Sequence, residues 1–179
     1  VDPMSVRSGY AESKRAGETM CVCWQHQYGV PAKIVRPFHT YGPGMRPDDG
    51  RVFADFVSDV VNARDIQMKS DGAARRTYCY VADATSAFFA VLLNGQSGQA
   101  YNVGNPDAEV SVLELARILV GLDPKKGLRV VRRSRPPGDE YVPSAVQRVR
   151  PDISKVRALG WAPTTGIEEG FGRTIRSFT

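Results

Sequence analysis

Segments typical of β-strands alternate with segments typical of α-helices along nearly the whole chain, and this alternation constrains the fold more than any other feature. Short runs rich in β-branched and aromatic residues read as strands, and longer runs with apolar residues at helical spacing read as helices. The expected strands are 31–38, 66–69, 76–81, 100–105 and 128–133, and the expected helices are 11–28, 51–63, 82–93, 111–121, 152–159 and 166–178. This order predicts an α/β fold with a mostly parallel sheet that helices cover on both faces.

The expected helix ends and loops carry local signals. Ser111 is the expected N-cap of the helix 111–121, with Glu114 three residues later as in a capping box. The helix 82–93 is expected to be capped near Asp83. Residues 39–50, HTYGPGMRPDDG, are dense in Gly, Pro and Asp and predict a loop after the strand 31–38.

Length and composition limit the classes of protein. A chain of 179 residues suits one domain or slightly more, and 42% hydrophobic with 24% charged residues is typical of a soluble globular protein. No apolar run is long enough to span a bilayer, and the first residues do not have the pattern of a signal peptide. Three Cys do not make a closed disulfide framework, so we expect a reducing, cytoplasmic location. The net charge of +5 suits an anionic ligand, either a phosphorylated metabolite or a nucleic acid.

Tyr10 and Lys14 are the first candidate reactive residues. They stand four positions apart, in GYAESKRAGE, so on a helix they share a face. An ammonium beside a phenol lowers the pKa of the phenol, and a phenol tuned in this way can take a proton from a sugar hydroxyl. The pair by itself is also compatible with one turn of an ordinary surface helix. A metal site is not expected, because Cys21 and Cys23 point apart on a helix and no His/Cys cluster completes a tetrahedral set.

Five motifs in order identify a resemblance. They are YAESKRAGE, RPFHTYGPGMRPDDGRV, SDGAARRTYCYVADA, AYNVGNP and RPDISKVRALGWAP, and together they cover nearly the whole chain. They resemble the carboxy-terminal half of the extended short-chain dehydrogenase/reductase family in its nucleotide-sugar branch, nearest to UDP-glucuronate decarboxylases and dTDP-glucose 4,6-dehydratases. The resemblance implies a partial Rossmann-like fold, a doubly wound parallel sheet, with a smaller α/β substrate-binding domain.

The resemblance implies an NAD-dependent epimerase, dehydratase or decarboxylase. Tyr10 would remove the proton from the sugar 4-hydroxyl while hydride passes to NAD, and Lys14 would hold the nicotinamide ribose. Family members begin with a Gly-rich turn that holds the NAD pyrophosphate, but no G-x-x-G-x-x-G occurs here. We therefore expect a fragment that lacks this half and is inactive alone. The alternative is a non-catalytic dehydrogenase-like protein that binds nucleic acid or acts as a regulatory module.

The resemblance also assigns binding residues for a UDP- or dTDP-linked sugar. His39, in HTYGPGM, stands where the family has an Asn that contacts the substrate diphosphate, so His39 is expected to bind substrate or cofactor, or to be a hydrogen-bonded structural histidine. Arg76 is expected to reach the diphosphate, because its planar fork meets two phosphate oxygens, although a solvated surface Arg is the alternative. The remaining expected contacts are Pro37 for the cofactor, and Arg51, Gln67, Met68, Arg135 and Arg148 for the substrate.

The resemblance also implies how the chain divides into domains and how the complete protein assembles. Residues 1–45, with 76–105 returning to them, would belong to the NAD-binding domain, and residues 46–75 and 106–179 to the substrate domain. Trp161 is expected to be a packing residue. Small and apolar positions on the first helix, such as Met20, together with the resemblance, predict a homodimer of the complete protein through that helix. The alternative is that upstream helices of the same subunit cover these positions.

Overall fold

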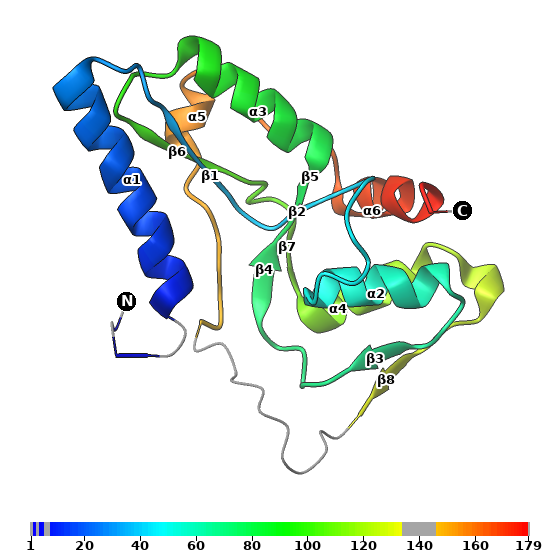
Figure 1. The fold of residues 1–179 in the computed structure, drawn as a ribbon. Helices are drawn as coiled ribbons and strands as arrows, with labels where there is room; N and C mark the ends of the chain where they lie inside the picture. The colour runs from blue at the N-terminus through cyan, green and yellow to red at the C-terminus, as the bar shows by residue number, and fades with distance from the viewer. Residues whose placement is uncertain (1, 3, 6–7, 134–145, 179) are drawn as a thin grey trace.

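The computed structural model describes residues 2, 4, 5, 8–133 and 146–178, which form an α/β structure (Figure 1). Its elements are α1 (Ser8–Tyr28), β1 (Ile34–Pro37), β2 (Thr40–Tyr41), α2 (Val52–Val61), β3 (Ile66–Met68), β4 (Arg75–Thr77), β5 (Cys79–Tyr80), α3 (Val81–Asn94), β6 (Ala100–Val103), β7 (Glu109–Ser111), α4 (Val112–Gly121), the 3-10 helix η1 (Pro124–Lys126), β8 (Val130–Arg132), α5 (Ser154–Arg157) and α6 (Ile167–Arg176). Every expected helix is present, and every expected strand except 76–81 is present as one strand, with shifted ends.

The strand pairing is mostly parallel, as predicted. β1 pairs with β6, β2 with β5 and β3 with β8, all parallel, whereas β4 pairs with β7 in antiparallel fashion. β1 and β6 are separated by α2 and α3 in the sequence, which rules out a hairpin at residues 31–38. The described strands form four two-stranded pairs rather than one continuous sheet.

The predicted strand 76–81 is wrong in detail. It divides at Tyr78, because Arg75–Thr77 pair with β7 and Cys79–Tyr80 pair with β2. The expected cap at Asp83 is also wrong: Tyr80 is the N-cap of α3, and Asp83 lies inside the first turn. The strands β2 and β7 and the helix η1 were not expected.

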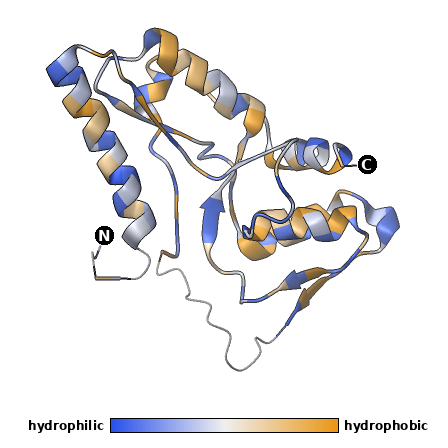
Figure 2. Ribbon diagram, in the orientation of Figure 1, coloured by the Kyte–Doolittle hydropathy of each residue, from blue (hydrophilic) through white to orange (hydrophobic). Residues whose placement is uncertain are grey.

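Two clusters of buried side chains make up the core. The first joins α2, α4 and α6 around Tyr41 and Tyr78, and Phe171 of α6 stacks on Tyr41 with ring centroids 3.8 Å apart. The second joins α3, α5 and β6 around Tyr101, and Trp161 packs into it as expected. Figure 2 shows the same pattern, since hydrophobic residues are frequent along α2, α3 and α4.

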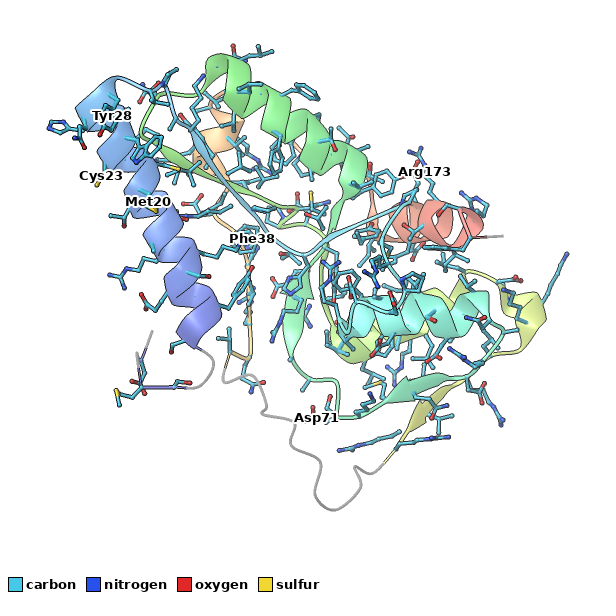
Figure 3. All side chains as sticks on the ribbon, in the orientation of Figure 1. Met20, Cys23, Tyr28, Phe38, Asp71 and Arg173 are labelled. Atoms are coloured by element: carbon cyan, nitrogen blue, oxygen red, sulfur yellow. The ribbon has the colours of Figure 1, made fainter. Side chains whose placement is uncertain are left out.

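The helix α1 is the least packed long element. Ser8 is its single buried residue in the described chain. An ion pair between Glu18 of α1 and Arg36 of β1 attaches it to the β1–β6 pair, with Arg36 Nε donating to Glu18 Oε1 at 2.6 Å. Along its exposed length lie Met20, Cys23 and Tyr28 (Figure 3). None of the helices in the described part of the chain combines the length and hydropathy needed to cross a membrane.

Candidate active site

Tyr10 and Lys14 lie one helical turn apart near the start of α1, as the sequence predicts. The Lys14 ammonium stands 5.6 Å from the centre of the Tyr10 ring, and both side chains are exposed, Tyr10 by 75%. Within the described residues, neither the Tyr10 hydroxyl nor the Lys14 ammonium has a hydrogen-bond partner. The pair is therefore open to a ligand, and its phenol and ammonium are the groups that a proton transfer from a sugar hydroxyl requires.

A second group of polar side chains forms around His39, which follows β1. Its ring lies 5.8 Å from that of Tyr78 and 6.4 Å from that of Phe53, and its Nδ1 is buried without a partner among the described residues. Burial lowers the pKa of His39, and the positive charges of Arg76 and Arg51 lower it further. The His39 ring is therefore held neutral beside two guanidinium groups. We call His39, Arg51 and Arg76 the cationic cluster.

The two arginines of this cluster are held differently. Arg51 is the N-cap residue of α2, donates from Nε to Asp49 at 2.7 Å, and lies over the Phe53 ring at 4.7 Å. Arg76 Nη1 donates to the main-chain oxygens of Arg75 and Gln147 at 2.8 and 3.2 Å. Arg76 Nη2 donates to the oxygen of Val146 at 2.8 Å. No carboxylate of the described residues pairs with Arg76, so its charge is available to an anion.

Gln67 and Met68 lie on β3, away from any direct contact with the cationic cluster that the structure describes. The Gln67 main-chain N–H donates to Asp59 at 3.3 Å, and the Met68 oxygen accepts from the Arg133 N–H at 2.9 Å. The Met68 side chain is buried in the first core cluster. The Gln67 N–H and the Met68 oxygen are therefore engaged within the protein.

The other predicted binding residues are dispersed. Pro37 lines an apolar pocket of about 450 Å³ together with Phe88 and Phe89 of α3. Arg148 forms a two-pronged ion pair with Glu109, at 2.6 Å from Nε and 2.9 Å from Nη2. Arg135 lies outside the described residues. Across the described chain, no hydrogen bond, ion pair or ring contact links the Tyr10–Lys14 pair to the cationic cluster.

Glu109 of β7 is a charged residue of this region that the sequence analysis missed. Its side chain is 11% exposed and faces Arg75, Arg148 and Arg150, with the closest atoms 3.4, 2.6 and 3.8 Å apart. The hydrogen bond from Arg148 lowers the pKa of Glu109, and Arg75 lowers it further. Nothing in the sequence distinguishes Glu109 among the 19 acidic residues, because its partners come from β4 and from beyond β8.

The described part of the chain contains no cluster of three or more His, Cys, Asp or Glu side chains that could hold a metal ion. Its three cysteines, Cys21, Cys23 and Cys79, are free thiols. Burial raises the pKa of the Cys79 thiol to about 12, so Cys79 is unreactive.

Comparison with known proteins gives a consistent result. Residues 1–104 match the sequence profile of the NAD dependent epimerase/dehydratase family. UDP-glucuronic acid decarboxylase 6 of Arabidopsis thaliana is 34% identical over 172 residues, which are 95% of this chain and 47% of that protein. The chain thus spans about half the length of the curated relatives it matches.

Solved structures agree with the parallel α/β architecture. An epimerase of Methanothermobacter thermautotrophicus superimposes with a TM-score of 0.83 and 28% identity, covering 98% of this chain and 51% of that one. A dTDP-glucose 4,6-dehydratase of Streptomyces venezuelae, solved with NAD bound, superimposes with a TM-score of 0.77 and 25% identity, covering 94% of this chain and 50% of that one. The expected Rossmann-like fold class is confirmed.

Proposed function

The chain belongs to the NAD dependent epimerase/dehydratase family, and we propose that it supplies the catalytic Tyr–Lys pair and the diphosphate-binding residues of a nucleotide-sugar enzyme. The exposed Tyr10–Lys14 pair is the observation that carries the proposal, because both polar groups lack partners in the described chain and lie on one helix face. The substrate would be a UDP- or dTDP-linked sugar, and the reaction would pass through a 4-keto sugar.

The donor set of α1 fits one end of NAD. An ammonium and a phenol one turn apart can hold the ribose hydroxyls next to the nicotinamide, and we assign this to Lys14 and Tyr10. Pro37 and His39, at the end of β1, are proposed to flank the same end, where open α/β sheets bind their ligands. No residue of this sequence is assigned to the NAD pyrophosphate.

Tyr10 would act as the base that takes the proton of the sugar 4-hydroxyl. The positive charge of Lys14 would orient the Tyr10 hydroxyl and favour that proton transfer. NAD, when bound, would supply a hydride acceptor for the sugar C4 and return that hydride in a later step. The resulting ketone stabilises a carbanion at the next carbon, so loss of CO2, loss of water or inversion becomes accessible. The similarity to UDP-glucuronic acid decarboxylases makes UDP-glucuronate the first substrate to test.

The cationic cluster is the proposed site for the diphosphate. Arg76 and Arg51 bring two guanidinium groups to one region, and His39 can add a hydrogen bond or accept a proton when an anion binds. Gln67 and Met68 are proposed near the nucleotide base, and Arg135 and Arg148 remain predicted substrate contacts.

Domain division and assembly are part of the proposal. The division we propose is the expected one, with 1–45 and 76–105 forming the cofactor part and 46–75 and 106–179 forming the substrate part. The core clusters follow it only in part, because the first also contains Tyr41, Tyr78 and Tyr80, and the second also contains Ile153, Val156 and Trp161. Among the described strands β1 pairs with β6 alone, and Phe88 and Phe89 of α3 are 46% and 58% exposed. We propose that further polypeptide of the complete protein packs on these surfaces, and that the 179-residue chain alone is inactive.

We also propose a homodimer through α1. Met20, Trp24 and Tyr28 recur every four residues and are 58%, 55% and 64% exposed, so they form an apolar stripe without a partner among the described residues of other elements. Met20→Glu should shift the complete protein towards monomer in analytical ultracentrifugation. A cytoplasmic location is supported by the three free thiols.

Product analysis tests the function. The complete protein would be supplied with NAD and, separately, with UDP-glucuronate, UDP-glucose and dTDP-glucose, and the products would be identified by mass. Loss of CO2 from the first, or loss of water from either of the others, supports the proposal and names the second step. Because an epimer has the mass of its substrate, chromatographic separation of epimers completes the measurement. If none of the three substrates is converted, the proposal is contradicted.

A further inference from the structure

The guanidinium of Arg76 is partly fixed by the protein itself. It has five N–H donors, and Nη1 and Nη2 together make three hydrogen bonds to main-chain oxygens at Arg75, Val146 and Gln147. The Nε–H has no partner among the described residues, and Nη2 makes one hydrogen bond with its two N–H groups. Nε and Nη2 together form one edge of the guanidinium, which is the edge that binds two oxygens of a phosphate. The main-chain oxygens therefore orient the fork that a diphosphate would use.

Two of those oxygens, at Val146 and Gln147, belong to a segment that lies along β4. The Arg75 N–H donates to the Gln147 oxygen at 2.8 Å, and the Val149 N–H donates to the Arg75 oxygen at 3.2 Å. Arg75 and Arg148 thus form a parallel β-bridge on one edge of β4, while β7 occupies the other edge. The segment makes few main-chain bonds, so its position depends on side-chain contacts as well.

Glu109 supplies such a contact from the far edge. It lies on β7 opposite Thr77 of β4, and its carboxylate reaches across β4 to Arg148 at 2.6 and 2.9 Å. It also accepts from Arg75 Nε at 3.4 Å. One carboxylate, 11% exposed, therefore ties β7 and β4 to the segment that holds Arg76.

We propose that Glu109 is a positioning residue, which holds the segment 146–149 on β4 through Arg148 and so keeps the Nε edge of Arg76 directed at the substrate diphosphate. The last part of this inference rests on the proposed function. Arg148 then acts as the link between Glu109 and the segment.

Glu114 provides a matched control within the same network. Its carboxylate accepts from Arg75 at 3.1 Å, as Glu109 does, but it makes no contact with Arg148. It also completes the capping box of α4, a position that Gln can fill as well, so Glu114→Gln mainly removes the charge that faces Arg75. A merely structural role for Glu109 would make Glu109→Gln and Glu114→Gln equivalent, whereas the proposal separates them.

The first measurement needs no substrate. In the complete protein, NMR would follow hydrogen exchange at the Arg75 and Val149 amides, whose hydrogen bonds join β4 to the segment. Glu109→Gln should speed both exchanges by about tenfold, because the segment opens more often, and Glu114→Gln should leave both within about twofold. Unchanged exchange at these amides in Glu109→Gln, or an equal effect of Glu114→Gln, would overturn the proposal.

The second measurement is the calorimetric affinity for UDP. Glu109→Gln should weaken it about fivefold, Glu114→Gln should not, and Glu109→Gln should add nothing in an Arg76→Ala background, because both changes act on the same contact. An additive effect would overturn the link to Arg76. If exchange responds as expected while the wild type does not bind UDP, the positioning is supported and the proposed function is the claim that fails.

Discussion

Asp83 offers the sharpest test of how the chain after β8 is attached to the rest of the fold. Its side chain is buried, at 6% exposed, in the first turn of α3. Oδ1 accepts from the Thr164 hydroxyl and Oδ2 from the Thr165 N–H, both at 2.9 Å. The main-chain oxygen of Asp83 also accepts from Trp161 Nε1 at 3.1 Å. One residue therefore fixes the loop 161–165 that leads into α6.

Asp83→Asn keeps the volume but replaces one acceptor with an amide donor. When the amide oxygen faces the Thr165 N–H, the amide nitrogen faces the Thr164 hydroxyl, which can turn and accept from it. Both contacts are then neutral hydrogen bonds, and the loss of their charge-assisted character costs about 1–2 kcal/mol. Loss of the negative charge at the α3 N-terminus adds about 0.3–1 kcal/mol. The free energy of unfolding should fall by about 1–3 kcal/mol, which is a shift of about 0.5–1.5 M in the urea midpoint for a slope near 2 kcal/mol/M.

Urea unfolding followed by far-ultraviolet circular dichroism measures this shift. The control is Asp107→Asn, because Asp107 is 75% exposed and stands 3.8 Å from Arg157, so its replacement should change stability by less than about 0.5 kcal/mol. A midpoint for Asp83→Asn that matches the control would refute the assigned role of the buried carboxylate.

Three further predictions concern the elements around the site. Gly42→Ala should lower the free energy of unfolding by about 2–4 kcal/mol, because φ is 155° and an added Cβ would lie 2.7 Å from a side-chain carbon of α3. Gly44→Ala, with φ 82° and open space around it, should lower it by about 1 kcal/mol. Thermal unfolding compares the two variants. Glu18→Gln should speed amide exchange along α1, because it weakens the ion pair with Arg36 that attaches the helix. The hydrogen bond from Arg36 lowers the Glu18 pKa, so in the wild type this attachment should also weaken as pH falls below 4.5. Amide exchange that does not depend on Glu18 would contradict this prediction. The free energy of unfolding should decline as pH falls below 6.5, because His39 takes up a proton in the unfolded chain at a higher pH than in the folded protein, where its pKa is lowered. In urea titrations at successive pH values, His39→Asn should reduce this dependence of stability on pH.

Local signals carried much of the fold. The pair Ser111 and Glu114 predicted a capping box, and the structure contains it, with Glu114 N–H donating to the Ser111 hydroxyl at 3.1 Å. The helix expected over 51–63 from its apolar spacing is also present, and Phe53, Phe56 and Val57 on its apolar face are buried in α2. Such features depend on residues three or four positions apart, which a sequence displays directly.

Features that depend on distant residues could not be predicted. Asp83 resembles a helix cap in sequence, but its partners at Thr164 and Thr165 lie about 80 positions away, so it became a buried anchor instead. The strand β7 was missed because three residues with one β-branched side chain give no alternating pattern, and β4 supplies the pairing that makes it a strand. Tyr10 and Lys14 were found because they are local, whereas Glu109 was not found because Arg75 and Arg148 reach it from other strands.

The central claim is that Tyr10 is the proton acceptor in oxidation of a nucleotide sugar, and one comparison tests it most directly. The single-turnover rate of reduced-cofactor formation, before the hydride is returned to the sugar, and the affinity for UDP-glucuronate would be measured in the complete protein for wild type, Tyr10→Phe and Arg76→Ala. We predict that Tyr10→Phe lowers the rate by about 10²–10⁴ with affinity unchanged, and that Arg76→Ala weakens binding by about 1.5–3 kcal/mol. A Tyr10→Phe variant that oxidises the sugar at the wild-type rate, or that loses affinity in place of rate, would contradict the account.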